Sequence, residues 1–501
     1  MKDSRYNLKS FLNSSHLYNL GHLPTEGFHP LTQDLSERTL LSSQDGINIL
    51  KEVDLTAFEK LETKKKSIET YQKWIQDHLK NNKKVFLSGC GATGRLAILL
   101  EFFFTRIKKS NSVVGFMAGG DAAFIRSIER FEDQKEFGAR QLKELGFKAN
   151  DLLIGITEGG ETPFVIGTVM HAIKAKGIPG FVYCNPKKTL IDTVERSKII
   201  LENHTVNDLE LFVGEMAISG STRMQATSIM MAALGFSLWG DLEFARWIDQ
   251  FFHAFTQVKW DQLEYWINYE YKAYQNSEWI HYESKTSALS VLTDTTERAP
   301  TFSLNPFKSQ LKNEPNSISY LIAPETTSSA EAWEIILGRK PRSLEWKETK
   351  EDTGLNQIYA FDLSETEKER RTKINSSHLI TINWTSQGLE IVFPKIKIIL
   401  SPPEKDLLIR ELLLKMILNQ VSTLTMTKLG KVKNNIMTHV KPSNGKLIDR
   451  AIRYLAKLNQ ENNINEPKVY AMYAKKIFEA IPEATQDSPA IQIALKKLQS
   501  F

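Results

Sequence analysis

The sequence predicts an α/β protein with two α/β units and a helical C-terminal segment. Three observations indicate this. Short apolar runs alternate with runs of helical period in the first half of the chain, glycines follow several of the short runs, and a less regular series of strand patterns returns after a long helical region. Short buried strands separated by helices form parallel sheets, which contact ligands at the carboxyl ends of their strands.

The first α/β unit is expected over residues 46–245, after a polar, turn-rich arm over 1–45 that is expected to be extended. Its predicted strands cover 84–88, 113–117, 152–156, 180–183 and 198–201, and its predicted helices cover 46–79, 95–104 and 162–174.

The second unit is less regular and follows a helical stretch over 221–274, so helical connection and second unit together are placed at 246–440. Its predicted strands cover 287–293, 317–322, 357–361 and 378–382, with a helix over 330–337 and an edge hairpin that includes 389–400. From 404 onward the chain is expected to be mostly helical, and 441–501 is assigned to a C-terminal helical segment.

Composition excludes several classes of protein. With 41% hydrophobic and 25% charged residues among 501, the chain has enough apolar side chains for sizeable cores and is neither disordered nor fibrous. The formal net charge of +5 is nearly neutral at this length, so no nucleic-acid partner is expected. Cys90 and Cys184, the only cysteines, exclude a disulfide framework and a cysteine zinc cluster.

The sequence also indicates where the protein works. Its N-terminus lacks the apolar core of a signal peptide, and no apolar run has the length that a membrane-spanning helix requires. We therefore expect a cytoplasmic protein with no membrane partner and without a metal or cofactor.

The first glycine-rich turn, SGCGATGR from Ser88 to Arg95, follows a predicted strand. Its glycines allow the backbone to approach a ligand, and the start of the next helix offers free N–H groups to an anion. The hydroxyls of Ser88 and Thr93 can add donors. A dinucleotide fingerprint also fits the glycines, but the second strand ends in two further glycines before Asp121, which favours a phosphate or sugar turn over an NAD site.

Acidic and hydroxyl residues follow in other loops. Glu129 and Glu132 share a face if ERFED is helical, where they can bind sugar hydroxyls or move a proton, or else form a solvated acidic face. GITEGGETP, from Gly155, and GEMAISGSTRM, from Gly214, combine glycines and hydroxyls before helices, which is also ordinary capping chemistry. LGKVKNN, from Leu429, puts cations beside a glycine.

Taken in order, SGCGATGRL, AGGD, ERFED, GITEGGETP, GEMAISGSTRM and LGKVKNNIM resemble the sugar isomerase (SIS) family, in the branch of N-acetylmuramic acid 6-phosphate etherase and glucokinase regulatory protein. The resemblance covers about 20–240 closely and 415–455 clearly. It implies flavodoxin-like, three-layer domains with parallel sheets, and a sugar phosphate as ligand.

The length of the chain favours the regulatory-protein side of this branch. The etherases are single-domain chains that dimerise, whereas this chain has strand and helix patterns between its two etherase-like blocks. The resemblance thus implies two SIS domains that form an internal counterpart of the etherase dimer, in a monomer or a homodimer. DTTERAPTF, from Asp294, is similar to a regulatory-protein segment whose glutamate, here Glu297, reaches the sugar phosphate of the first domain.

The family's elimination reaction uses two glutamates. One matches Glu132, but the other falls at Phe103, which cannot transfer protons. Glu101 lies two positions away, which on a helix turns its side chain by about 200°. The resemblance therefore implies a non-catalytic or weakly catalytic sensor, with a protein partner such as a sugar kinase by analogy. The alternative is an etherase or phosphosugar isomerase that uses Glu132 as its catalytic residue.

The family's ligand contacts carry over to individual positions. Gly91, Ala92 and Thr93 match the first phosphate turn, and Thr157 matches a phosphate-contacting serine. Glu161 replaces a second serine, so it either needs a cation such as Arg95, Arg223 or Lys431, or faces sugar hydroxyls. The predicted ligand-binding residues are Ser88, Gly91, Ala92, Thr93, Glu129, Glu132, Thr157, Glu161, Ser221, Arg223, Glu297 and Lys431.

Overall fold

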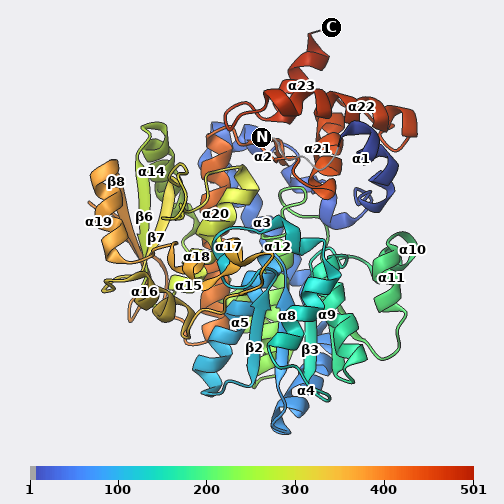
Figure 1. Cartoon of the computed structure of the whole chain (residues 1–501). Helices are drawn as coiled ribbons and strands as arrows, with labels where there is room; N and C mark the ends of the chain where they lie inside the picture. The colour runs from blue at the N-terminus through green and yellow to red at the C-terminus, as the bar shows by residue number, and fades with distance from the viewer. Residues whose placement is uncertain (1–6, 501) are drawn as a thin grey trace.

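The computed structural model describes residues 7–500, and within them two five-stranded sheets flank a long helix, α20 (Leu407–Lys428). From Leu412 to Thr427 every side chain of α20 is buried. The helices that pack around it are α2 (Leu35–Leu41), α3 (Ser43–Glu62), α12 (Gln225–Trp239), α14 (Leu263–Gln275) and α15 (Ala288–Phe302). This helix therefore joins the two α/β units into one body (Figure 1).

The first sheet is wholly parallel, as predicted. Its strands, in spatial order, are β2 (Val113–Met117), β1 (Val85–Gly89), β3 (Leu152–Ile156), β4 (Ile178–Tyr183) and β5 (Asn207–Glu210). All of β1 is buried, with Val85 and Leu87 in one core cluster and Phe86 in another. The first cluster contains α4 (Lys65–Lys80), α5 (Ala92–Lys108) and α12 (Gln225–Trp239), and the second contains α8 (Lys135–Glu144) and α9 (Pro163–Lys174).

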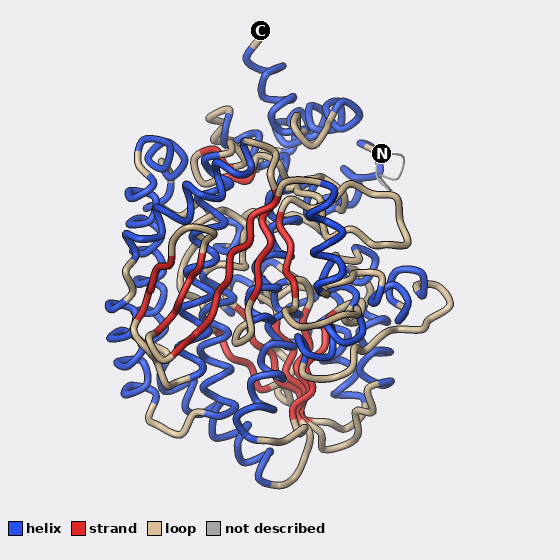
Figure 2. The backbone as a smooth tube through the Cα atoms, turned by 90° about the vertical axis from the view of Figure 1, so that its left-hand side faces the viewer, coloured by secondary structure: helices blue, strands red, loops and turns tan. Residues whose placement is uncertain are grey.

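The second sheet is mixed. Its order is β10 (Lys397–Ser401), β9 (Gly388–Val392), β8 (Ser377–Thr385), β6 (Trp279–Glu283) and β7 (Ser319–Ile322). β6 pairs with β7 and β8 in parallel, while β8, β9 and β10 are antiparallel neighbours, which confirms the predicted edge hairpin (Figure 2).

Three predicted strands are helical instead. Residues 198–201 lie in α11 (Glu195–Leu201), 287–293 lie almost wholly in α15 (Ala288–Phe302), and 357–361 overlap α18 (Leu355–Tyr359). Each is a short apolar run, whose periodicity cannot distinguish a strand from a buried helical segment. The fifth strand of the first sheet is instead the polar edge strand β5, which follows α11. The strand of the second sheet that precedes α15 is β6.

The N-terminal arm is not extended. Its described part contains α1 (Leu8–Ser14), three single 3₁₀ turns and α2 (Leu35–Leu41), because Phe11, Leu23 and Leu35 are buried. The helix expected over 46–79 is divided into α3 (Ser43–Glu62) and α4.

The C-terminal segment packs on this arm, as α1 contacts α22 (Figure 1). It contains α21 (Gly445–Leu458), α22 (Pro467–Ala480) and α23 (Ala490–Gln499), after a hairpin of β11 (Val432–Lys433) and β12 (Ile436–Met437). The remaining helices are α6 (Ala122–Ile125), α7 (Glu129–Glu132), α10 (Lys187–Thr193), α13 (Phe244–Gln257), α14 (Leu263–Gln275), α16 (Ser329–Leu337), α17 (Lys350–Thr353) and α19 (Glu365–Ile374). Within 7–500, no helix combines the length and the apolar character needed to cross a membrane.

Candidate functional site

A cavity of about 280 Å³, called here the main cavity, opens at the carboxyl edge of the first sheet. Both units and both ends of the chain contribute to its wall. The first unit supplies the turns after β1 and β3, the loop before α7 and the segment before α12, while α15, α21 and the arm residues Thr25 and Glu26 close the rest.

The turn after β1 takes its shape from glycine. A Cβ on Gly89 would lie 2.3 Å from the backbone carbonyl of Thr93, and Gly91 has a φ of 56°. Gly91 and Ala92 line the main cavity at the start of α5, where free N–H groups and the helix dipole favour an anion.

Two predicted ligand residues of this turn do not line the main cavity. Thr93 is buried, and its hydroxyl donates to the Cys90 carbonyl at 3.0 Å while accepting from the Cys90 N–H at 3.1 Å. Ser88 is also buried and accepts a hydrogen bond from Thr168 at 3.1 Å. Both hydroxyls therefore hold the turn in place instead of facing the cavity.

Glu132, at the end of α7, lines the main cavity. Burial raises the pKa of its carboxyl, against the opposing effect of Lys446. Glu129 also lies on α7, but its side chain is outside the described part of the structure. Of the two acidic residues in ERFED that the sequence suggested, Glu132 is therefore the one whose position in the cavity is established.

Glu158 also lines the main cavity, although the sequence analysis did not select it. It is buried, and its carboxylate accepts a hydrogen bond from Thr227 at 3.3 Å. Burial raises the pKa of Glu158 to about 7, helped by the nearby charge of Glu297. A carboxyl with this pKa can both accept and donate a proton near neutral pH. Its position two residues after a parallel strand was the signal that could have found it.

The other residues of this turn act differently from expectation. Thr157 is buried and shares a hydrogen bond of 2.9 Å with Thr162, which lines the cavity in its place. Glu161 is paired with Arg196 at 2.5 Å and Lys446 at 2.7 Å, not with Arg95, Arg223 or Lys431. Burial alone would raise the pKa of Glu161, but these two cations outweigh it and lower the pKa to about 2.

Glu297, on α15 of the second unit, lines the main cavity. Its side chain is buried, and Oε1 has no hydrogen-bond partner among the described residues. Burial raises its pKa, which the charges of Arg95 and Arg223 counteract. An unpaired carboxyl oxygen in a cavity is suited to a hydroxyl or another donor of a ligand.

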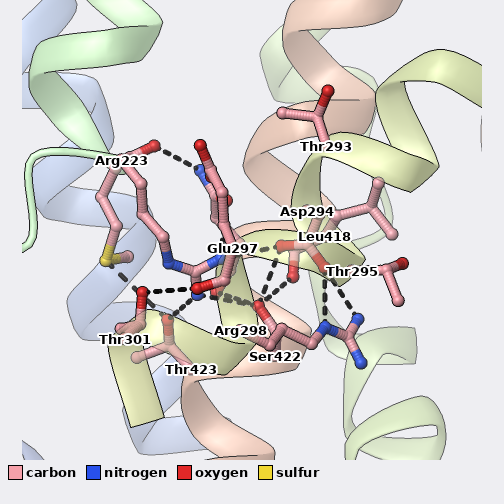
Figure 3. A network of polar contacts seen from close by, with 12 residues as sticks. Arg223, Thr293, Asp294, Thr295, Glu297, Arg298, Thr301, Leu418, Ser422 and Thr423 are labelled. Atoms are coloured by element: carbon pink, nitrogen blue, oxygen red, sulfur yellow. Dashed lines mark hydrogen bonds and ion pairs between the residues drawn. The ribbon is translucent and has the colours of Figure 1, made fainter. Parts of the chain in front are cut away.

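Arg223 lies beside Glu297 in Figure 3, but both terminal nitrogens of its guanidinium are hydrogen-bonded within the protein. Nη1 donates to Asp294 at 3.0 Å, and Nη2 donates to Ser422 at 3.0 Å and Thr423 at 3.2 Å. Both Arg223 and Ser221 line the main cavity. Arg223 thus ties the segment before α12 to α15 and α20.

Lys431 does not line the main cavity; it begins the β11–β12 hairpin, and burial lowers its pKa. The lysine that does line the cavity is Lys446, four residues before Arg450 on α21. Arg450 forms a two-pronged ion pair with Glu26, at 2.9 and 2.7 Å. No sequence signal distinguishes α21 from an ordinary amphipathic helix, so these two cations could not have been selected.

The position of the family's second glutamate is closed. Phe103 is buried, packs against the ring of Phe102 and does not line the main cavity. Glu101 is paired with Arg342 at 2.5 Å and Arg339 at 3.2 Å, both from the second unit. The two residues point away from each other, as their helical separation predicts, and neither offers a proton-transfer group to the cavity.

The main cavity thus combines a helix start that favours anions with three carboxyls that have raised pKa values: Glu132, Glu158 and Glu297. Ion pairs among the described residues engage Lys446 with Glu161 and Arg450 with Glu26, but none of these three carboxyls. Such an arrangement can hold a phosphorylated polyol, with its phosphate on α5 and its hydroxyls on the carboxyls.

The chain is similar to a glucokinase regulatory protein domain and to N-acetylmuramic acid 6-phosphate etherases. The model of the glucokinase regulatory protein N-terminal SIS domain matches residues 66–173. N-acetylmuramic acid 6-phosphate etherase of Nostoc sp. is 31% identical over 216 residues, 43% of this chain and 66% of the relative. The etherase of Thermosynechococcus vestitus is 32% identical over 224 residues, 44% of this chain and 68% of the relative. The chain therefore spans about two thirds of these relatives.

Among solved structures, tagatose-6-phosphate ketose/aldose isomerase from Escherichia coli has a TM-score of 0.41 at 11% identity. That alignment covers 82% of this chain and 97% of the isomerase.

Proposed function

The chain belongs to the sugar isomerase (SIS) family, in the branch of N-acetylmuramic acid 6-phosphate etherase and glucokinase regulatory protein, and on this premise we propose that it is a sugar-phosphate sensor. The observation that carries the proposal is the main cavity, in which both units meet at the start of α5.

In this proposal the phosphate binds at Gly91 and Ala92, and the hydroxyls of Ser221 and Thr222 add donors. The sugar extends toward Glu132, Glu158 and Glu297, whose oxygens accept hydrogen bonds from its hydroxyls. Glu297 comes from the second unit, so the ligand bridges both units. A ligand that bridges them changes their arrangement only by its differential affinity for the two arrangements.

The absence of turnover is proposed from Phe103 and Glu101. The family's elimination uses a second acid–base group, and loss of such a group costs about 10²–10⁴ in rate. Phe103 has no such group and Glu101 is held by two arginines. A kinase as the partner that reads the bound state is drawn from the resemblance to the regulatory protein.

The test is to incubate the protein with fructose 6-phosphate, fructose 1-phosphate, glucosamine 6-phosphate and N-acetylmuramic acid 6-phosphate, and to follow thermal stability and product formation in the same samples. The sensor predicts stabilisation by one compound, about 2.7 kcal/mol at 100 times its Kd, without turnover. Lactate release or ketose–aldose conversion would reject it. Stabilisation by none of the compounds would reject sugar-phosphate binding.

A second candidate function, a phosphosugar isomerase, is favoured by Glu158. In an aldose–ketose conversion one carboxylate takes the proton from C2 and returns it to C1, while a second group moves the hydroxyl proton from one oxygen to the other. Glu132 and Glu158 line one cavity and can divide these steps. This function needs no glutamate at 103.

If turnover is found, Glu132→Gln and Glu158→Gln should each lower kcat by about 10²–10⁴. Glu136→Gln, an exposed glutamate of the neighbouring helix α8, is the matched control and should leave kcat unchanged. A turnover that survives both cavity substitutions would exclude these residues as the proton-transfer pair.

A further inference from the structure

A second cavity, of about 250 Å³, lies between the two units and shares Ser127 and Ile128 with the main cavity. These residues precede α7, the helix that carries Glu132. The remaining wall comes from α6 and Arg130 on the first unit, and from Lys312, Asp352 and α18 on the second. No predicted ligand residue lines it.

Cations dominate this second cavity. Among its described lining residues, Arg126, Arg130 and Lys312 are positive, and Asp352 is the one carboxylate. Arg130 Nη2 and Lys312 Nζ both lie 3.1 Å from Asp352, one on each oxygen. A single negative charge is thus shared between two cations; because Glu314 neutralises Arg126, the groups at this cavity carry a net formal charge of +1.

Two donors on this wall are unused. Arg126 binds Glu314 through both terminal nitrogens, at 2.9 and 2.5 Å, yet its buried Nε has no partner in the described structure. Gln357 is only 4% exposed; its Oε1 accepts from Ser309 at 3.5 Å, and no hydrogen bond is formed by its amide nitrogen within residues 7–500. The Gln357 amide nitrogen is therefore free to donate to a ligand in the cavity, whereas Arg126 Nε has almost no accessible surface and does not reach one.

From this excess of charge and donors we propose that the second cavity is a regulatory site for a small dianion, either inorganic phosphate or a phosphate monoester. The dianion binds Arg130 and Lys312 through charge-assisted hydrogen bonds and accepts from Gln357. Anion binding at this site does not depend on what the main cavity binds, whereas its regulatory effect rests on the sugar-phosphate binding proposed above.

Occupancy of the second cavity is expected to affect the main cavity through the shared segment. An anion that orders Arg130 on α7 and the adjoining Ser127 and Ile128 also changes how freely Glu132 moves in the main cavity. Coupling of this kind is reciprocal: each ligand changes the affinity of the other by the same factor.

The first test is equilibrium dialysis of the full chain with radiolabelled inorganic phosphate at low ionic strength. The double variant Arg130→Met/Lys312→Met should bind one phosphate fewer per chain than the natural protein. Lys347→Met, which removes an exposed lysine outside the cavity, is the control and should bind the same number. Equal stoichiometry in the double variant and the natural protein would overturn the proposal, whether or not phosphate also binds in the main cavity.

A substitution that should raise phosphate affinity tests whether misfolding explains the weaker binding of the double variant. Asp352→Asn removes the one lining carboxylate, so phosphate affinity at the second cavity should rise by about fivefold, the effect of one charge at contact distance in a solvated site. No gain with Asp352→Asn in a chain of unchanged Tm would overturn the charge argument.

The regulatory step has its own readout. Sugar-phosphate affinity at the main cavity, titrated at increasing phosphate, should depart from simple competition in the natural protein and follow simple competition in the double variant. Identical competition curves would overturn the coupling. A phosphate monoester as the source of the dianion would appear as tighter second-site binding of glycerol phosphate than of phosphate.

Discussion

Each sheet has a central parallel strand that leads into a helix. At the first sheet the start of that helix opens on the main cavity, and at the second sheet it packs against the protein. In the first sheet β1 lies between β2 and β3 and leads into α5; in the second, β6 lies between β7 and β8 and leads into α15. Both strands are parallel to their two neighbours. The two helix starts therefore present the same free N–H groups and dipole end.

The protein fills the second of these sites with its own carboxylate. Ser287 and Ser290, at the start of α15, donate to Glu411 of α20 at 2.8 and 2.5 Å. Glu411 is buried, and burial raises the pKa of its carboxyl against the opposing effect of the two serine hydrogen bonds. At the start of α5 the chain supplies Gly91 and Ala92 and leaves a cavity. The start of α15 thus packs against a carboxyl of the protein itself, and the start of α5 opens on the main cavity.

The second unit still contributes to the wall of the main cavity, through α15. Glu297 lies two turns further along this helix and enters the main cavity of the first unit. The start of α15 thus packs against Glu411, while a later residue of the same helix, Glu297, forms part of the wall of the main cavity.

The largest effect should come from a substitution that distorts the glycine turn before α5. In Gly89→Ala the new Cβ meets the backbone of Thr93, so we expect a loss of about 3 kcal/mol and no sugar-phosphate binding. Gly146→Ala, at a glycine that has a positive φ and open space around it, should cost about 1 kcal/mol and leave binding intact. Thermal melts with and without ligand measure both; binding by Gly89→Ala would break the comparison.

The pH dependence of stability should report the ionisation of Glu158, which lines the main cavity. Glu158 has a folded pKa of about 7 against 4.5 unfolded, so between these values the unfolded chain ionises first and stability falls as pH rises, by up to about 3 kcal/mol. Glu158→Gln should therefore match the natural protein near pH 4.5 and exceed it at pH 8. Parallel profiles of Tm against pH would contradict a raised pKa.

Substitutions at the start of α15 should change stability and leave ligand affinity unchanged. Ser287→Ala with Ser290→Ala leaves the buried Glu411 carboxylate without two donors, which costs about 1–3 kcal/mol. Affinity for the sugar phosphate should stay the same, because the change lies outside the main cavity. Urea unfolding and a binding titration check the two halves of this prediction; weaker binding would mean that the second helix start also serves the ligand.

The smallest effect is expected at Lys431, the lysine that the family resemblance selected. Because it does not line the main cavity, Lys431→Met should change stability by no more than about 0.5 kcal/mol and leave affinity unchanged. Lys446→Met should weaken binding. If calorimetric titration shows the reverse order, the position of Lys431 in solution differs from the one described.

The local sequence was sufficient for four of the five strands of the first sheet and for its glycine turn. Four of its strands lie where buried apolar runs predict them, and Gly89 and Gly91 mark the ligand side. Prediction failed at residues 198–201, 287–293 and 357–361, where short apolar runs are helical. Their environment, not their periodicity, decides the outcome.

The sequence by itself determined the fold class, the glycine turn before α5 and the loss of the glutamate at 103, since each depends on residues close together in the chain. Only the tertiary structure decided which charges meet at the cavity. Glu161 is neutralised by Arg196 and Lys446, and Glu158 faces Glu297 across the two units. Long-range contacts set the burial and pairing of each charge, and these are what fix a side chain's pKa and its availability to a ligand.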